Sequence, residues 1–244
     1  MISLMHKINL SKTVFTVATV SLLALTGCFH DDDDDDDITI EPPIDPVVIS
    51  YQISVSNITH AQPMSPVTVV LHNGGQLWSI GEPASAALEL LAESGDGSDV
   101  LSLDMVLASG VGEGVLMPGL TQSIMVTSVE VVPSHLSLAT MLVNTNDAFT
   151  GVNAMSLTNL AVGESISMLT SSYDSGTEKN SELVTTIPGP AGGGEGFNAE
   201  RDDVDFVAMH PGVVSQDDGL AQSALTNAHR FDNPTLRVTV TRME

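Results

Sequence analysis

Alternating apolar and polar residues mark two segments, one near each end of the folded part of the chain, as β-strands. Residues 51–57 place Tyr51, Ile53 and Val55 at alternate positions, and residues 236–240 repeat the pattern. Successive side chains of a strand point to opposite faces, so this period predicts strands with one buried side. We expect the two segments to pair and close the fold.

The remaining pattern predicts many strands and one helix. The helix opens at Gly81-Glu82-Pro83, because proline suits a first helical turn, and it ends before Gly95. Strands joined by short turns, without intervening helices, indicate an all-β fold, an antiparallel β-sandwich with one short helix. Residues 189–233 lack regular periodicity, so we expect irregular loops there. The other predicted strands are residues 67–71, 123–132, 136–143, 152–160 and 165–171.

The first 27 residues have the order of a secretory signal peptide. Lys7 and Lys12 precede a short apolar run, which is followed by Leu25-Thr26-Gly27-Cys28. The apolar run is shorter than the about 20 residues that span a membrane. The last four residues resemble the lipobox of bacterial lipoproteins, which implies cleavage before Cys28 and lipidation of its thiol. We therefore expect a lipoprotein in the cell envelope of a Gram-negative bacterium, held at the outer membrane and facing either the periplasm or the outside.

Residues 28–46 are predicted to be an acidic tether. Residues 31–37 are seven consecutive Asp, and Glu41-Pro42-Pro43 follows. Like charges repel and proline resists helix and sheet, so this segment is expected to be extended. The composition changes to Val, Ile, Ser and Thr at Val47, which predicts one domain over residues 47–244.

The charge of the chain excludes nucleic acid as a partner. The formal net charge is −24, and loss of Lys7 and Lys12 with the signal peptide would make it −26. Phosphate recognition needs clustered Lys and Arg, and the remaining basic residues are scattered. An acidic surface favours divalent cations instead.

Two oxygen-rich segments are the candidate site for such a cation. An apolar run at residues 138–143 leads into Asn144-Thr145-Asn146-Asp147, and a second segment begins Tyr173-Asp174. Carboxylate and amide oxygens, such as those of Asp147, Asp174, Asn146 and Asn153, are ligands of calcium. The alternative is that Asp147 and Asp174 only cap turns through their own backbone.

The motifs of common enzymes are missing from the sequence. There is no Gly-x-Ser-x-Gly elbow, and no two His residues have the spacing of a zinc site. We therefore expect a non-enzymatic protein. The alternative is a carbohydrate-active protein, either a glycan-binding module that stacks a sugar on Trp78 or a weak hydrolase that uses loop acids such as Asp202-Asp203.

Several short motifs, taken in order, resemble the spondin domain, the amino-terminal module of F-spondin and mindin. The resemblance covers roughly residues 51–242. The motifs are Tyr51-Gln52-Ile53, Gly81-Glu82-Pro83-Ala84-Ser85, Asn144 through Asn153, Tyr173-Asp174-Ser175-Gly176-Thr177-Glu178, His210-Pro211-Gly212 and Leu236-Arg237-Val238-Thr239-Val240.

The resemblance implies a C2-like β-sandwich that binds calcium and acts in adhesion. The family's loop acids fall on Asp147 and Asp174, and its further oxygen positions fall on Asn153 and Glu178, where this chain departs from the Asp of the family. A third acidic ligand has no clear counterpart, with Glu130 the nearest acid. We therefore expect a calcium-binding adhesion protein, attached to the membrane through Cys28, that contacts an extracellular protein or glycan.

Overall fold

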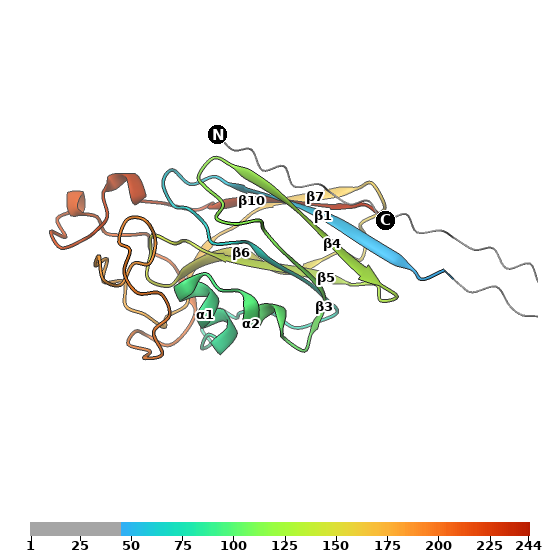
Figure 1. Cartoon of the computed structure of the whole chain (residues 1–244), viewed down its shortest axis with the longest axis horizontal. Coiled ribbons are helices and arrows are strands. Elements are labelled where there is room, and N and C mark those ends of the chain that lie inside the picture. Colours follow the sequence, from blue (N-terminus) through green and yellow to red (C-terminus); the bar gives the residue numbers. More distant parts are fainter. Residues whose placement is uncertain (1–44) are drawn as a thin grey trace, which may run out of the picture. The chain divides into compact units, whose positions relative to one another are not determined.

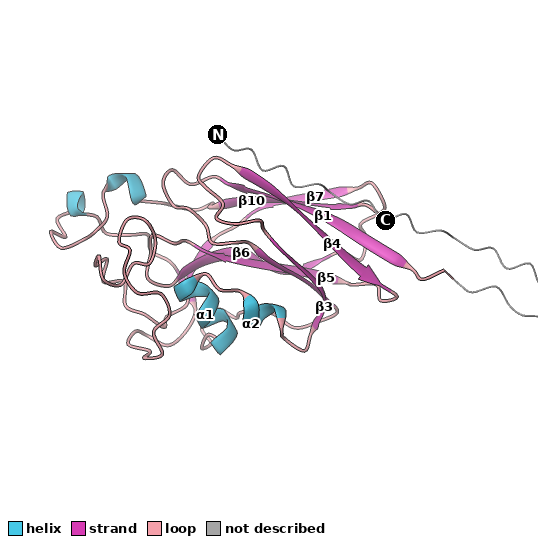
Figure 2. Cartoon of the chain, viewed as in Figure 1, coloured by secondary structure: helices cyan, strands magenta, loops and turns pink. Residues whose placement is uncertain are grey.

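The structure, a computed structural model, describes residues 45–244. The predicted signal peptide, Cys28 and nearly all of the predicted tether lie outside the described residues. The described residues form one unit, built from two antiparallel sheets packed face to face (Figures 1 and 2). The predicted all-β sandwich with one short helix is confirmed. Among the described residues, no helix is long and apolar enough to cross a membrane.

The smaller sheet has four strands in the order β4-β1-β10-β7. The predicted pairing of the first and last strands is confirmed, because Tyr51 lies opposite Arg242 and Asn57 opposite Leu236. Along β1, buried residues alternate with half-buried ones, as expected for a strand with only one face on the core. The strands are β4 (Thr121–Val129), β1 (Val48–Asn57), β10 (Leu236–Arg242) and β7 (Ser165–Leu169).

The larger sheet has six strands in the order β3-β2-β5-β6-β8-β9. Its central strands β2 and β5 are buried on both faces, which explains why their sequences are continuous apolar and small polar runs. The strands are β3 (Val106–Val111), β2 (Thr68–His72), β5 (His135–Met141), β6 (Ala148–Ser156), β8 (Ser172–Asp174) and β9 (Ala208–Met209).

The helix α1 (Ala86–Ser94) covers the outer face of the larger sheet (Figure 1). It begins at Ala86, later than the start at Pro83 that the sequence predicted. Ser85 is the N-cap, and its side chain accepts a hydrogen bond from the Leu88 amide at 3.2 Å. A left-handed Gly95 ends it as expected. A single turn, α2 (Ser98–Leu101), follows.

Trp78 belongs to an aromatic cluster under α1. Its side chain is 7% exposed, and its ring centroid lies 5.1 Å from that of Phe149 and 5.2 Å from that of Tyr173. Apolar residues of α1, including Leu88 and Leu91, pack on the same cluster. Trp78 is therefore a core residue and presents no open face on which a sugar could stack.

The strand after the oxygen-rich loop begins earlier than predicted. β6 already starts at Ala148, so that the connection from β5 is short and Phe149 to Asn153 are strand residues. Between β8 and β10 lies an irregular segment, which contains only β9 and two short 3-10 turns, η1 (Gln216–Asp218) and η2 (Asn227–His229), as the lack of periodicity indicated.

Candidate cation site

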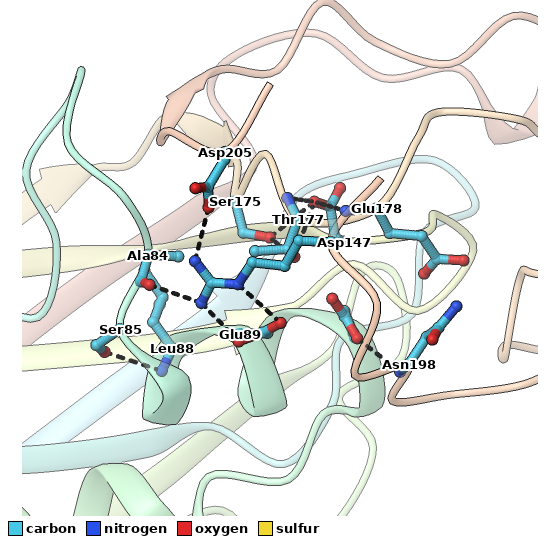
Figure 3. Close-up of polar contacts among 12 residues, drawn as sticks. Ala84, Ser85, Leu88, Glu89, Asp147, Ser175, Thr177, Glu178, Asn198 and Asp205 are labelled. Carbon is cyan, nitrogen blue, oxygen red and sulfur yellow. Dashed lines mark hydrogen bonds and ion pairs between the residues drawn. The ribbon is translucent and has the colours of Figure 1, made fainter. Parts of the chain in front are cut away.

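Asp147 is the centre of a buried polar cluster at one end of the larger sheet. It is 0% exposed and lies between β5 and β6. One carboxylate oxygen, Oδ2, accepts hydrogen bonds from Ser175 Oγ at 2.7 Å, the Thr177 amide at 2.9 Å and the Glu178 amide at 3.1 Å (Figure 3). Asp147 therefore fixes the turn after β8 against the start of β6.

The backbone of that turn requires glycine at position 176. Gly176 has a φ of +71°, in the left-handed region that side chains disfavour. A Cβ atom there would also collide with the carbonyl oxygen of Phe206. Glycine thus lets the turn lie close to the backbone at Phe206, just before β9. In this conformation the amides of Thr177 and Glu178 point at Asp147.

Four side-chain oxygens around this turn are buried and have no hydrogen-bond donor. They belong to an amide and three carboxyl groups, which are all no more than 5% exposed. The four atoms are Glu93 Oε1, Asn146 Oδ1, Asp147 Oδ1 and Glu178 Oε2. Buried polar atoms are nearly always satisfied, so these acceptors are candidates to receive a proton, a water or a cation.

The second polar atom of each of these side chains is bonded to a different loop. Glu93 Oε2 accepts from the Asn198 amide at 2.8 Å. Asn146 Nδ2 donates to Thr186 Oγ1 at 2.7 Å and lies 3.4 Å from Glu178 Oε1. These contacts hold α1, the β5–β6 connection and the irregular segment around one cluster and orient the side chains that carry the unsatisfied oxygens.

The cluster raises the pKa values of its carboxyl groups. Burial, and then the charge of Asp174, raises the pKa of Asp147 to about 7. Burial raises the pKa of Glu178 to about 8, with Glu93 and Asp147 adding to the effect through repulsion. Burial also raises the pKa of Glu93. Desolvation and like charges disfavour the ionised forms, and a bound cation would reverse both effects.

A cavity of about 300 Å³ adjoins the cluster. Glu178 contributes to its wall, as do Thr186 and Asn198, which bond to Asn146 and Glu93. Glu195 and Asp202 line it as well. The cavity therefore lies beside the cluster, and Lys179 lines it together with the acidic residues.

Asp174, a predicted ligand, already has a donor for each carboxylate oxygen. The Gly176 amide donates to Oδ1 at 2.8 Å, and Asn180 Nδ2 donates to Oδ2 at 2.6 Å. This is the turn-capping role that the sequence left open as the alternative. Asp174 remains close enough to Asp147 to influence its pKa.

Asn153, another predicted ligand, lies elsewhere. Its amide bridges the segment before α1, because Oδ1 accepts from the Leu77 amide at 2.9 Å and Nδ2 donates to the Trp78 carbonyl at 2.7 Å. Both polar atoms of Asn153 are satisfied by this segment. The structure brings Asp147, Asn146 and Glu178 together and leaves Asn153 out of the cluster.

Glu93 belongs to the cluster but was not predicted from the sequence as a site residue. Glu89 and Glu93 are spaced four residues apart on α1, and this like-charge pair was the available signal, because such pairs need compensation. The structure compensates Glu89 with Arg201, which donates to its two oxygens at 3.0 and 2.6 Å. Glu130 is exposed, at the end of β4.

Within residues 45–244, no three His, Cys, Asp or Glu side chains stand in a ready metal-binding arrangement. The four unsatisfied oxygens include an amide, a ligand type that calcium accepts and transition metals favour less. Their chemistry fits a hard cation such as calcium.

No protein-family model matches the chain, and no curated protein matches it either. The fold and the site define the protein as a β-sandwich with a buried, oxygen-rich cluster. The resemblance to spondin domains stays a prediction.

Proposed function

We propose that the protein is a non-enzymatic, calcium-binding adhesion module of the cell envelope, similar to spondin domains and anchored through a lipid on Cys28. Glu93, Asn146, Asp147 and Glu178 hold the cation. Asp174 supports the site by shaping the turn that carries Glu178.

The four buried oxygens without donors are the observation that supports this proposal. Each buried acceptor left without a partner costs about 1 to 3 kcal/mol. A cation among them offsets that cost and also neutralises carboxylates that repel one another. No Lys or Arg is among the four residues, so either a proton or an external cation neutralises these carboxyl groups.

Calcium fits this set better than the other common ions. It takes about six to eight oxygen ligands in flexible geometry, including amide oxygens and water. Zinc would call for nitrogen or sulfur ligands, which the cluster lacks. Binding draws the carboxylates toward the ion, since their mutual repulsion is then screened.

The proposed role in adhesion follows from what the site joins. Its residues tie α1 and the irregular segment to the sandwich through Asn198 and Thr186, so a bound cation would make this end rigid. Rigid loops bind partners with less loss of entropy. An enzymatic function has less support, and the burial of Trp78 removes the residue proposed for sugar stacking.

Thermal unfolding of the purified full-length protein tests the site. A ligand that binds only the folded state stabilises it by about 2.7 kcal/mol at a hundred times its Kd. For a domain of this size, that corresponds to a rise in Tm of about 5 to 10 °C. We expect this rise when millimolar calcium replaces EDTA, and an unchanged Tm would refute the proposal.

Two isosteric variants separate cation binding from ordinary packing. Glu178→Gln and Glu93→Gln each replace a carboxyl group whose pKa is raised by burial with a neutral amide, so each should raise the Tm in EDTA and reduce the response to calcium. Glu164→Gln is the matched control, because Glu164 Oε2 accepts an exposed hydrogen bond from the Ala161 amide that glutamine can also accept. Calcium responses equal to that of the wild type in both cluster variants would contradict the assignment.

A further inference from the structure

Hydroxyl side chains line much of the outer face of the four-stranded sheet, and an exposed Val48–Val129 pair lies at one end of it. The strand registers place three complete rows of four side chains across this face. The rows are Ser123–Ser54–Thr239–Ser167, Thr121–Ser56–Arg237–Leu169 and Met125–Gln52–Thr241–Ser165. We name these twelve residues the hydroxyl face. Neighbours within a row are spaced by about 4.8 Å and rows by about 7 Å.

Cross-strand hydrogen bonds fix the hydroxyl groups. Ser167 Oγ lies 2.8 Å from Thr239 Oγ1, and Ser165 Oγ lies 2.7 Å from Thr241 Oγ1. Each hydroxyl has one donor and two acceptor positions, so a paired group retains capacity for a ligand. Three such pairs, the third between Ser56 and Thr121 at 2.7 Å, fix six of the eight hydroxyl groups of the face.

The charge of the hydroxyl face is opposite to that of the rest of the protein. The chain carries 31 Asp and Glu residues, and none of them is among the twelve residues. Arg237 is exposed in the face. Within residues 45–244, Lys179, Arg201 and Arg230 each pair with a carboxylate, whereas Arg237 pairs with none.

The composition of the hydroxyl face argues against a protein partner. Protein interfaces gain most of their energy from buried aromatic and apolar residues. This face has no aromatic residue, and its large apolar side chains, Met125 and Leu169, stand in two different rows on its two outermost strands. Dense hydroxyl groups with a single cation match a ligand that is itself rich in hydroxyl groups and carries few negative charges.

We infer that the hydroxyl face binds a polysaccharide of low charge density, in which an acidic sugar that pairs with Arg237 alternates with uncharged sugars. The extended sugar chain lies across the strands and exchanges hydrogen bonds with the Ser and Thr rows. A densely charged polymer is disfavoured, because acidic residues surround the face and repel it within the Debye length of about 8 Å. This binding is independent of the proposed cation site.

Calorimetric titration of the full-length protein with hyaluronan oligosaccharides, in EDTA at physiological salt, tests the inference. In hyaluronan, a carboxylated sugar alternates with an uncharged one. Arg237→Gln removes a charge-assisted hydrogen bond and should weaken binding by about tenfold or more. Ser54→Glu places a negative charge in the middle row and should abolish binding. Ser109→Glu, the same change at an exposed position of β3 in the other sheet, should have no effect.

Circular dichroism confirms that the variants fold, and Arg237→Gln tests the face without changing its shape. No binding of hyaluronan by the wild type would overturn the inference. Equal affinities of the wild type, Arg237→Gln and Ser54→Glu would also overturn it, as would equally tight binding of uncharged chitin oligosaccharides. Because EDTA is present throughout, the result does not depend on whether the protein binds calcium.

Discussion

The outer faces of the two sheets differ in nearly every physical respect. The larger sheet is covered by α1, by the aromatic cluster around Trp78 and by the irregular segment, so that Phe149 on its outer side is 0% exposed. Among the described residues, the smaller sheet carries no helix on its outer face (Figure 2), and Met125 there is 51% exposed. The central strands of the larger sheet are buried on both sides, whereas the smaller sheet is buried on one.

This difference separates two kinds of polar chemistry. Beside the covered sheet, polar groups are desolvated, so their charges repel strongly and their pKa values shift, as at Asp147. On the open sheet, polar groups are hydrated and paired across strands, as at Ser167 and Thr239. The proposed cation site lies in the first environment, and the proposed binding face for a weakly charged polysaccharide lies in the second.

Truncation of a large side chain on each outer face should produce the largest contrast. Phe149→Ala removes a ring packed against Trp78 and Tyr173 and should lower the free energy of unfolding by about 3 to 5 kcal/mol. Met125→Ala on the open sheet should change it by less than about 0.5 kcal/mol. Urea titration of both variants measures the difference, and similar losses would show that the open face is covered in solution.

Loss of the ion pair that joins α1 to the irregular segment should have an intermediate effect. Glu89 is 6% exposed and receives two hydrogen bonds from Arg201. Glu89→Ala leaves that guanidinium partly buried and should cost about 2 to 3 kcal/mol. Lys179→Ala breaks an exposed pair with Asp202 and should cost less than about 1 kcal/mol. Chemical denaturation of both variants tests this, and equal costs would mean that the covering segment detaches easily.

A buried acid in the irregular segment should give the smallest effect, and one that depends on pH. Burial raises the pKa of Glu182 to about 6 from 4.5. The folded state therefore binds more protons between these pH values, and stability falls as the pH rises through them. Glu182→Gln keeps an oxygen to accept from the Val214 amide and should be more stable than the wild type by about 1 to 2 kcal/mol above pH 6.

The gain from Glu182→Gln should vanish below pH 4.5, where the wild-type carboxyl group is neutral in both states. Thermal unfolding of the two proteins across this range measures the effect. A gain that is constant with pH would show that Glu182 ionises freely in the folded state.

Much of the fold could be predicted from the sequence, because alternating apolar and polar residues indicate a strand with one buried face. The alternation in residues 51–57 and 236–240 predicted both strands and their pairing, and the register confirms it. The helix was located through proline and glycine, although Ser85 determined its first residue. The early start of β6 was missed, since β6 is buried on both sides at its beginning and shows no alternation there.

The candidate site could be predicted only in part. The sequence by itself determined the sandwich, the irregular segment and the polar loop with Asp147 and Asn146, because these depend on local patterns. Only the tertiary structure decided that Glu93 of α1 faces this loop, that Asp174 and Asn153 are satisfied by neighbouring groups, and that four oxygens are left without donors. Those properties depend on contacts between residues distant in the sequence, and burial, which makes an unpaired oxygen costly, arises only when those segments pack together.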